Sequence, residues 1–351
     1  NGKVNITSGG AVKLGTSGSD TVKLGNISVS GSDFDYSGND VKIDGNITAD
    51  NVNFTNINSF TQNANTTVTA STGNIVVDTA GNAVLNGLLQ ATSGNVKVNA
   101  SNITSNSSNA ITASTIELVA ANSIGSESSA LNFTATGSVN AQSGTGMNLN
   151  SASAVTFGDL LNTSSGNIKV SAGGDAQFAK VTNTNGNITI SSTGSAALSD
   201  KVQGVDVTFN TGDIIASNAN SLISGTNINL TSSGSVGSSS GAVAVESANG
   251  INAAANNGSI YLAGTGATKF NNVSAKNAVE LSTKAGILET TGAISGGTVK
   301  ITSASDTVVN STVKSTGATE IISAGELTIN AASGTTPITS GSTVNLSGTN
   351  I

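Results

Sequence analysis

Apolar and polar side chains alternate along much of this chain in short segments, many of which begin with glycine and asparagine. After Gly166 and Asn167, for example, the apolar residues Ile168 and Val170 flank the charged residue Lys169. An alternation with a period of two places every second side chain on the same face of a β-strand. Val, Ile and Thr dominate these segments and no apolar period of 3.6 residues runs for a useful length, so the pattern predicts strands rather than helices.

These segments form a degenerate repeat. A Gly-Asn-Ile or Gly-Asn-Val start recurs with spacings of 20 residues from 25 to 45, 21 residues from 73 to 94 and 20 residues from 166 to 186. Glycine and asparagine tolerate the positive φ that tight corners require, so each Gly-Asn pair is expected at a corner of the chain. The six pairs are Gly25 and Asn26, Gly45 and Asn46, Gly73 and Asn74, Gly94 and Asn95, Gly166 and Asn167, and Gly186 and Asn187.

Apolar residues recur at fixed offsets of +2, +4, +12 and +15 from the corner glycine. Three short strands per repeat, each contributing inward side chains, account for these offsets. At +15 we expect Leu88 and Val181 to face the interior. The residues expected to stack in the interior at the other offsets are Ile75, Val77, Leu85, Ile168, Val170, Phe178, Ile188, Ile190 and Leu198.

The predicted fold is therefore all-β, a right-handed parallel β-helix or β-solenoid with three short strands per coil. At about 20 residues per coil the 351 residues make roughly 17 coils, which at about 4.8 Å per stacked strand extend roughly 80 Å. We expect one continuous solenoid over residues 1–351. Because the chain begins at Asn1 rather than Met, we interpret it as a processed protein or a segment of a longer one.

Composition agrees with a thin interior and narrows the chemistry. Aromatic residues make up 3 % of the chain and charged residues 9 %, with 42 glycines against one proline. The chain contains no Cys, His, Trp or Arg, which removes disulfides and the Ser-His-Asp, Cys-His and guanidinium-assisted mechanisms. We therefore expect a protein that is not an enzyme and uses no cofactor and no metal.

Charge and hydropathy exclude two classes of partner. The net charge is −7 and the 13 lysines are scattered, so there is no basic patch for nucleic acid. No apolar run approaches the roughly 20 residues of a membrane span. We expect neither a nucleic-acid partner nor a transmembrane segment.

The segment 165–178, Ser-Gly-Asn-Ile-Lys-Val-Ser-Ala-Gly-Gly-Asp-Ala-Gln-Phe, resembles the repeats of filamentous haemagglutinin and related exoproteins of two-partner secretion systems. The resemblance is clearest at 73–105 and 160–205, and it implies a right-handed parallel β-helix within a large bacterial surface exoprotein. The amino-terminal secretion domain of that family carries an Asn-Pro-Asn-Gly-type motif. Here the one proline, Pro337, follows Thr336, so the resemblance implies a repeat-bearing shaft.

Acidic residues gather in one part of the sequence, at Asp33, Asp35, Asp40 and Asp44. If Gly25 and Gly45 open successive coils, Asp33 stacks on Asn53, and Phe34 stacks on Phe54. We interpret these carboxylates chiefly as turn formers, with a Ca²⁺ site or a sugar-binding site as alternatives. A polysaccharide-acting enzyme would use such carboxylates as a pair, which is the least favoured alternative.

The phenylalanines at 34, 54, 133, 157, 178, 209 and 270 are expected inside the coils rather than on a sugar-stacking surface. Tyr36 and Tyr261 are ambiguous, because a buried hydroxyl needs a partner. Asn side chains on successive coils are expected to form ladders, with Asn26 over Asn46 and Asn167 over Asn187 as the best candidates. If a localised binding site exists, we expect it in the irregular stretches 105–160 and 215–255.

The functional expectation is a structural rod of a bacterial cell-surface or extracellular fibre or adhesin, acting in surface attachment or in biofilm or filament assembly. Its expected partners are other copies of itself, flanking repeats of the same long chain, or surface glycans and host receptors. The expected location is the cell surface or extracellular matrix. The alternative is a carbohydrate- or receptor-binding β-helix module.

Overall fold

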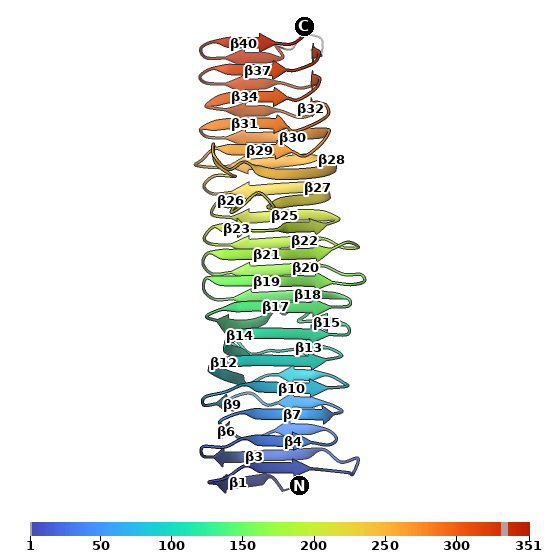
Figure 1. The fold of residues 1–351 in the computed structure, drawn as a ribbon, viewed down its shortest axis with the longest axis vertical. Helices are drawn as coiled ribbons and strands as arrows, with labels where there is room; N and C mark the ends of the chain where they lie inside the picture. The colour runs from blue at the N-terminus through green and yellow to red at the C-terminus, as the bar shows by residue number, and fades with distance from the viewer. Residues whose placement is uncertain (1, 331–335) are drawn as a thin grey trace. The chain divides into compact units, whose positions relative to one another are not determined.

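The computed structural model describes residues 2–330 and 336–351, and these residues form strands and turns without any helix. The chain winds as a right-handed parallel β-helix, a β-solenoid of about 16 turns, as the repeat predicted. It divides into two compact units, one ending at Gly174 (unit 1) and one beginning at Asp175 (unit 2). Within each unit, short strands from successive coils lie side by side (Figure 1).

The strands of unit 1 are β1 (Val4–Ser8), β2 (Val12–Gly15), β3 (Val22–Val29), β4 (Phe34–Ser37), β5 (Val41–Ile43), β6 (Ile47–Ala49), β7 (Val52–Ile57), β8 (Phe60–Gln62), β9 (Thr67–Ala70), β10 (Ile75–Thr79), β11 (Ala83–Leu85), β12 (Leu88–Ala100), β13 (Ile103–Thr104), β14 (Ile111–Ala120), β15 (Ser123–Ile124), β16 (Leu131–Ala135), β17 (Ser138–Ser143), β18 (Gly146–Ser151), β19 (Val155–Asn162) and β20 (Ile168–Ala172).

Parallel pairing arranges these strands in three sheets. The first sheet follows β1, β3, β6, β9, β12, β14 and β16, and the second follows β3, β5, β8, β11, β13, β15, β18 and β20. The third sheet follows β2, β4, β7, β10, β12, β14, β17 and β19. Long strands such as β12 turn a corner and so contribute to two sheets.

The strands of unit 2 are β21 (Ala176–Asn183), β22 (Ile188–Ser192), β23 (Ala196–Leu198), β24 (Lys201–Gly204), β25 (Asp206–Thr211), β26 (Ile214–Ala216), β27 (Leu222–Ser232), β28 (Val243–Ala255), β29 (Ile260–Gly264), β30 (Thr268–Ala275), β31 (Ala278–Thr283), β32 (Leu288–Thr290), β33 (Ile294–Gly296), β34 (Thr298–Ser303), β35 (Thr307–Val309), β36 (Val313–Ser315), β37 (Thr319–Ser323), β38 (Leu327–Ile329), β39 (Ile338–Ser340) and β40 (Val344–Ser347). All pair in parallel, for example β22 with β25 and β31 with β34.

The interior of each unit is a narrow stack of β-branched, leucine and phenylalanine side chains. All nine residues predicted to stack there are buried, with at most 1 % of any of them exposed. The +15 position is the exception, because Val181 is buried but Leu88 is only half-buried. Leu89 points inward in its place and pairs with Val68 in the first sheet, so the strand enters one residue later than predicted.

The Gly-Asn corners do not mark one column, which corrects the single register assumed above. Ile27 pairs with Ile47 in the first sheet, Ile75 pairs with Val96 in the third, and Ile168 pairs with Met147 in the second. The pairs at 25 and 45, at 73 and 94, and at 166 therefore open strands on three different sides of a coil. A glycine followed by asparagine and a β-branched residue suits any of the three corners.

Most corner glycines serve close approach rather than positive φ. A Cβ added to Gly94 would lie 1.8 Å from the carbonyl oxygen of Gly73, and one on Gly45 would lie 2.4 Å from the carbonyl carbon of Gly25. Gly166, in addition, has a positive φ of 96°. The backbones of successive coils pass so closely at these corners that a side chain does not fit between them.

No helix in residues 2–330 or 336–351 has the length and apolar character needed to cross a bilayer.

Candidate functional site

The predicted acidic cluster is divided among different strands, and each carboxylate is bonded to the neighbouring coil. Asp33 precedes β4, and its Oδ1 accepts hydrogen bonds from the backbone N–H (3.1 Å) and the Nδ2 (2.8 Å) of Asn51. Asp35 on β4 accepts one from Asn53 Nδ2 at 2.8 Å, and its Oδ2 lies 3.8 Å from Lys13 Nζ. Both carboxylates thus join one coil to the next.

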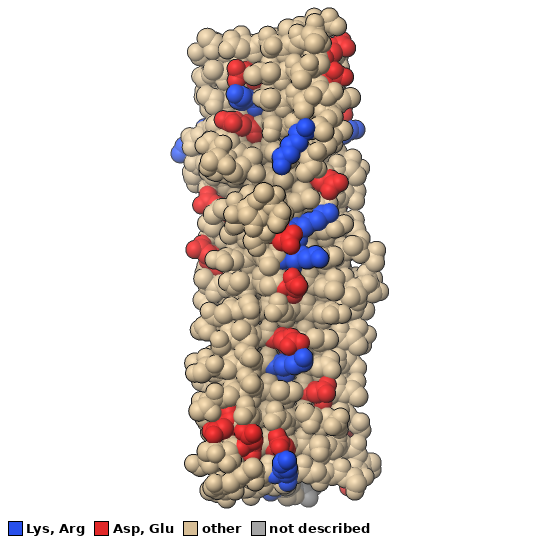
Figure 2. Space-filling view, in the orientation of Figure 1, with Lys and Arg blue, Asp and Glu red and all other residues tan. Residues whose placement is uncertain are grey.

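Asp40 and Asp44 lie on either side of β5, in the second sheet. Asp40 accepts a hydrogen bond from Ser59 Oγ at 2.7 Å. Asp44 accepts one from Asn63 and lies 3.8 Å from the ammonium groups of both Lys3 and Lys42. In the described part of the chain, no three acidic, His or Cys side chains come together as a metal site. On the face drawn in Figure 2, acidic and basic side chains are spread singly or in small groups among neutral ones.

The register around Asp33 differs from the predicted one. Asp35, not Asp33, faces Asn53, and Tyr36, not Phe34, faces Phe54. Asp35 and Asn53 are 18 residues apart rather than the predicted 20, because the corner between β6 and β7 is two residues shorter than the one between β3 and β4. Phe34 still touches Phe54 diagonally, with ring centroids 6.0 Å apart in an edge-on arrangement.

Almost all aromatic rings are inside the coils, as predicted for phenylalanine. All eight phenylalanines are buried, and Tyr36 is 1 % exposed. A sugar-stacking surface built from phenylalanine is therefore wrong for this chain. Tyr261, between the buried residues Ile260 and Leu262 of β29, is the one aromatic side chain of the described residues that reaches the surface.

Asparagine links the coils in two ways. At the corners, the side-chain oxygen accepts a hydrogen bond from a backbone N–H of the next coil. Asn26 Oδ1, for example, accepts one from Asn46 N–H at 3.0 Å. The predicted side-chain ladder between these two residues is thus a side-chain-to-backbone ladder; the one between Asn167 and Asn187 stays a prediction. Along the strands, side-chain ladders do form, as from Asn150 Nδ2 to Asn132 Oδ1 at 2.7 Å.

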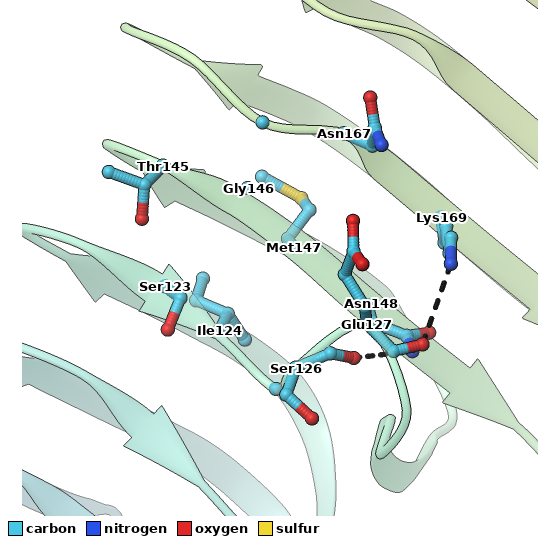
Figure 3. A pocket seen from close by; sticks show the side chains of 12 residues that line it. Ser123, Ile124, Ser126, Glu127, Thr145, Gly146, Met147, Asn148, Asn167 and Lys169 are labelled. Atoms are coloured by element: carbon cyan, nitrogen blue, oxygen red, sulfur yellow. Dashed lines mark hydrogen bonds between the residues drawn. The ribbon is translucent and has the colours of Figure 1, made fainter.

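One cavity of unit 1 lies beside the second sheet, in the irregular stretch 105–160 and at the start of β20. It has a volume of about 140 Å³ and is lined by parts of β15, β18 and β20 and by the loop 125–130. In Figure 3 the apolar side chains of Ile124 and Met147 lie between two polar ends, one with Thr145 and the other with Lys169. Ile124 and Met147 are only 0 % and 3 % exposed, so the open surface of the cavity comes from the other lining residues, which are glycine or polar.

Hydrogen bonds hold the loop 125–130 against the sheet at the Lys169 end. Asn148 Nδ2 donates to the backbone oxygen of Ser126 at 2.8 Å, and Lys169 Nζ donates to that of Glu127 at 3.4 Å (Figure 3). Because backbone oxygens accept both bonds, the Glu127 carboxylate is left to face solvent and the cavity. Sequence reasoning indicated the stretch but not these residues, since none belongs to a recognisable motif.

Comparisons with protein-family models, curated proteins and solved structures gave no match to this chain. The functional argument consequently rests on the geometry described above.

Proposed function

We propose that this chain is a structural element of a bacterial cell-surface or extracellular fibre, in which stacked coils hold attachment or matrix contacts away from the cell. The observation that carries the proposal is which hydrogen-bond partners its polar side chains have. They bond predominantly to the next coil rather than to near neighbours in sequence. Asn99 bonds to Asp78, Asn252 to Asn229 and Asn330 to Asn310, across 21, 23 and 20 residues.

The charged side chains follow the same rule. Lys97 pairs with Glu117 at 2.8 Å, and in unit 2 Lys300 pairs with Glu320 at 3.0 Å. In both pairs the glutamate is the residue that faces the lysine on the next coil. An exposed ion pair contributes only about 0–1 kcal/mol, so no single pair decides stability. Repeated at coil after coil, such pairs and the asparagine bonds favour cohesion along the stack, which is what a shaft requires.

The alternative of a carboxylate-dependent polysaccharide-acting enzyme gains no support from Asp33, Asp35 or Asp40. Such an enzyme needs two carboxyl groups about 5–10 Å apart on either side of a sugar bond. Here each carboxylate is bonded to an Asn or Ser of the following coil. Their arrangement fits coil-to-coil links, so we retain the non-enzymatic proposal.

The proposal is tested in the organism that carries the gene. Antibodies raised against the folded chain are expected to label intact, unpermeabilised cells or the surrounding matrix. A strain lacking the gene is expected to attach to surfaces or to form biofilm less well, and restoring the gene restores attachment. Label that enters only permeabilised cells, or a deletion strain with normal attachment and matrix, would contradict the proposed role.

A further inference from the structure

Asparagine followed by glycine occurs at four places in residues 2–330 and 336–351, namely at 86–87, 185–186, 249–250 and 257–258. Asparagine is chemically labile, and a following glycine, which has no Cβ, leaves its backbone nitrogen unhindered. That nitrogen can attack the side-chain carbon Cγ if the asparagine side chain is free to rotate and the glycine N–H is not held by a strong hydrogen bond. The dipeptide is the same at all four pairs, so the fold decides which of them reacts.

At two of the pairs the asparagine side chain is bonded to a neighbouring coil. Asn86 Oδ1 accepts a hydrogen bond from the backbone N–H of Asn106 at 3.0 Å, and Asn86 is half-buried. Asn257 Nδ2 donates to the backbone oxygen of Ser233 at 3.1 Å. Each of these bonds has to break before the side chain can turn toward the following glycine.

At a third pair the glycine is held instead. Asn249 is exposed, but it lies inside β28, and the N–H of Gly250 donates to Ser247 Oγ at 3.0 Å. Gly250 also faces Asn227 of β27 in the parallel ladder. The nitrogen of Gly250 therefore cannot approach the Asn249 side chain unless the strand opens.

Asn185 meets both conditions. It lies exposed at the turn between β21 and β22, and its side chain makes no hydrogen bond to any residue that the structure describes. The N–H of Gly186 donates to the backbone oxygen of Asn183 at 3.4 Å, which is long for a hydrogen bond of this kind. Opening this turn disturbs no strand, because β21 ends at Asn183 and β22 begins at Ile188.

We propose that Asn185 is a site of spontaneous deamidation, at which the chain modifies itself through a succinimide. The Gly186 nitrogen loses its proton to water or hydroxide and bonds to Asn185 Cγ, while the Cγ–Nδ2 bond breaks and ammonia leaves. Water then opens the five-membered ring. Cleavage of the ring at Cγ gives aspartate, whereas cleavage at the main-chain carbonyl gives isoaspartate, in which the chain continues through the side-chain carbonyl. Water is the one co-reactant, and nothing is oxidised or reduced.

The position of the site makes both products compatible with the stack. Each product adds one negative charge, and isoaspartate also adds one methylene to the main chain, at an exposed turn outside the strands. The same methylene at Asn249 would lie inside β28 and displace residues that pair with β27. The chain therefore gains charge with age at this turn while it keeps its coils. This inference does not depend on the proposed structural role.

The test compares the four pairs in one incubation. The full chain is held at mildly alkaline pH, with and without enough urea to unfold it, and is then digested with trypsin. Cleavage after Lys180 and Lys201 separates Asn185 from the other three pairs. Mass spectrometry with electron-transfer fragmentation measures aspartate and isoaspartate at each pair. In the folded chain we expect Asn185 to react roughly fivefold to tenfold faster than any other pair, the factor that corresponds to one hydrogen bond. In urea the four rates should approach one another.

Two variants test the cause of this selectivity. Asn185→Gln lengthens the side chain, so the five-membered ring cannot form, and it should remove most of the early product without changing the melting temperature. Ser247→Ala removes the acceptor of the Gly250 N–H and should raise the rate at Asn249. Equal rates at the four pairs of the folded chain, a faster reaction at any pair other than 185–186, or an unreacted Asn185 in a chain that does react in urea would overturn the proposal.

Discussion

Tyr36 places both its ring and its hydroxyl inside unit 1, but only the ring has suitable neighbours. The residue is 1 % exposed, and its ring centroid lies 6.3 Å from that of Phe54. Its hydroxyl has no hydrogen-bond partner among the described residues. A buried polar group without a partner destabilises a fold by about 1–3 kcal/mol. We therefore expect Tyr36→Phe to raise the free energy of unfolding by about 1 kcal/mol, measured by urea denaturation.

The control for this prediction is Tyr261→Phe. Tyr261 reaches the surface, so its hydroxyl is hydrated and its removal should leave the free energy of unfolding almost unchanged. A loss of stability in Tyr36→Phe would mean that the hydroxyl is bonded inside unit 1, contrary to its geometry there.

Asn74 connects three coils through one side chain and one backbone group. Its backbone N–H donates to Asn51 Oδ1, and its own Oδ1 accepts from the backbone N–H of Asn95, both at 2.8 Å. Asn74→Ala removes the second bond and should lower the free energy of unfolding by about 1 kcal/mol. Asn74→Asp keeps an oxygen at the same place and should lose much less at neutral pH. Equal losses in the two variants would show that the side-chain acceptor is not what matters at this corner.

At the scale of the strand and its corner, Gly94 marks one of the closest approaches between coils of unit 1. An added Cβ there would lie 1.8 Å from Gly73 O, so Gly94→Ala has to push two coils apart. Overpacking of this kind lowers the free energy of unfolding by about 1–3 kcal/mol. Gly18→Ala is the matched control, since nothing lies within 4 Å of a Cβ at that exposed turn. Similar urea midpoints for the two variants would contradict the close approach.

The same corners show why the strands could be predicted from the sequence but their columns could not. Alternation alone identified inward residues such as Ile75 and Phe178, because a half-buried strand requires it. The Gly-Asn pair, however, suits the tight corner between strands equally well on each side of a coil. Equal spacing between two Gly-Asn pairs therefore fixes the coil length but not which sheet the following strand joins.

The loops 125–130 and 237–242 could not be predicted from the sequence, for a different reason. Their similar sequences, at 123–131 and 235–243, are separated by several coils and leave no periodic signal, and serine, glycine and alanine in a loop resemble ordinary turn composition. Their shared features are the positive φ of Gly125 and Gly237 and the register of the flanking strands, which are properties of the backbone. Lys169 and Tyr261 become part of a pocket only because neighbouring coils place them beside a loop.

For the molecule as a whole, stability accumulates from contacts between adjacent coils, as in other solenoids. Charges follow the same local scheme, with Lys269 paired at 3.5 Å to Glu289, which faces it on the next coil. The chain nevertheless has 20 acidic residues against 13 lysines, so negative charge remains in excess. The resulting net charge acts between molecules rather than within the fold.

Because the net charge depends on pH, two kinds of self-association can be distinguished by changing the pH. The chain carries −7 at pH 7 and has an isoelectric point near 4.5, so mutual repulsion disappears on acidification. We expect light scattering to rise near pH 4.5 and to return to its starting value at pH 7, because proteins without net charge associate weakly and reversibly. A fibre assembled through strand edges is held by backbone hydrogen bonds instead, and should form at pH 7 and persist through the pH cycle. Electron microscopy at pH 7 before and after the cycle distinguishes the two. Filaments in both samples would support the fibre, whereas particles that cluster only near the isoelectric point would assign the association to lost charge.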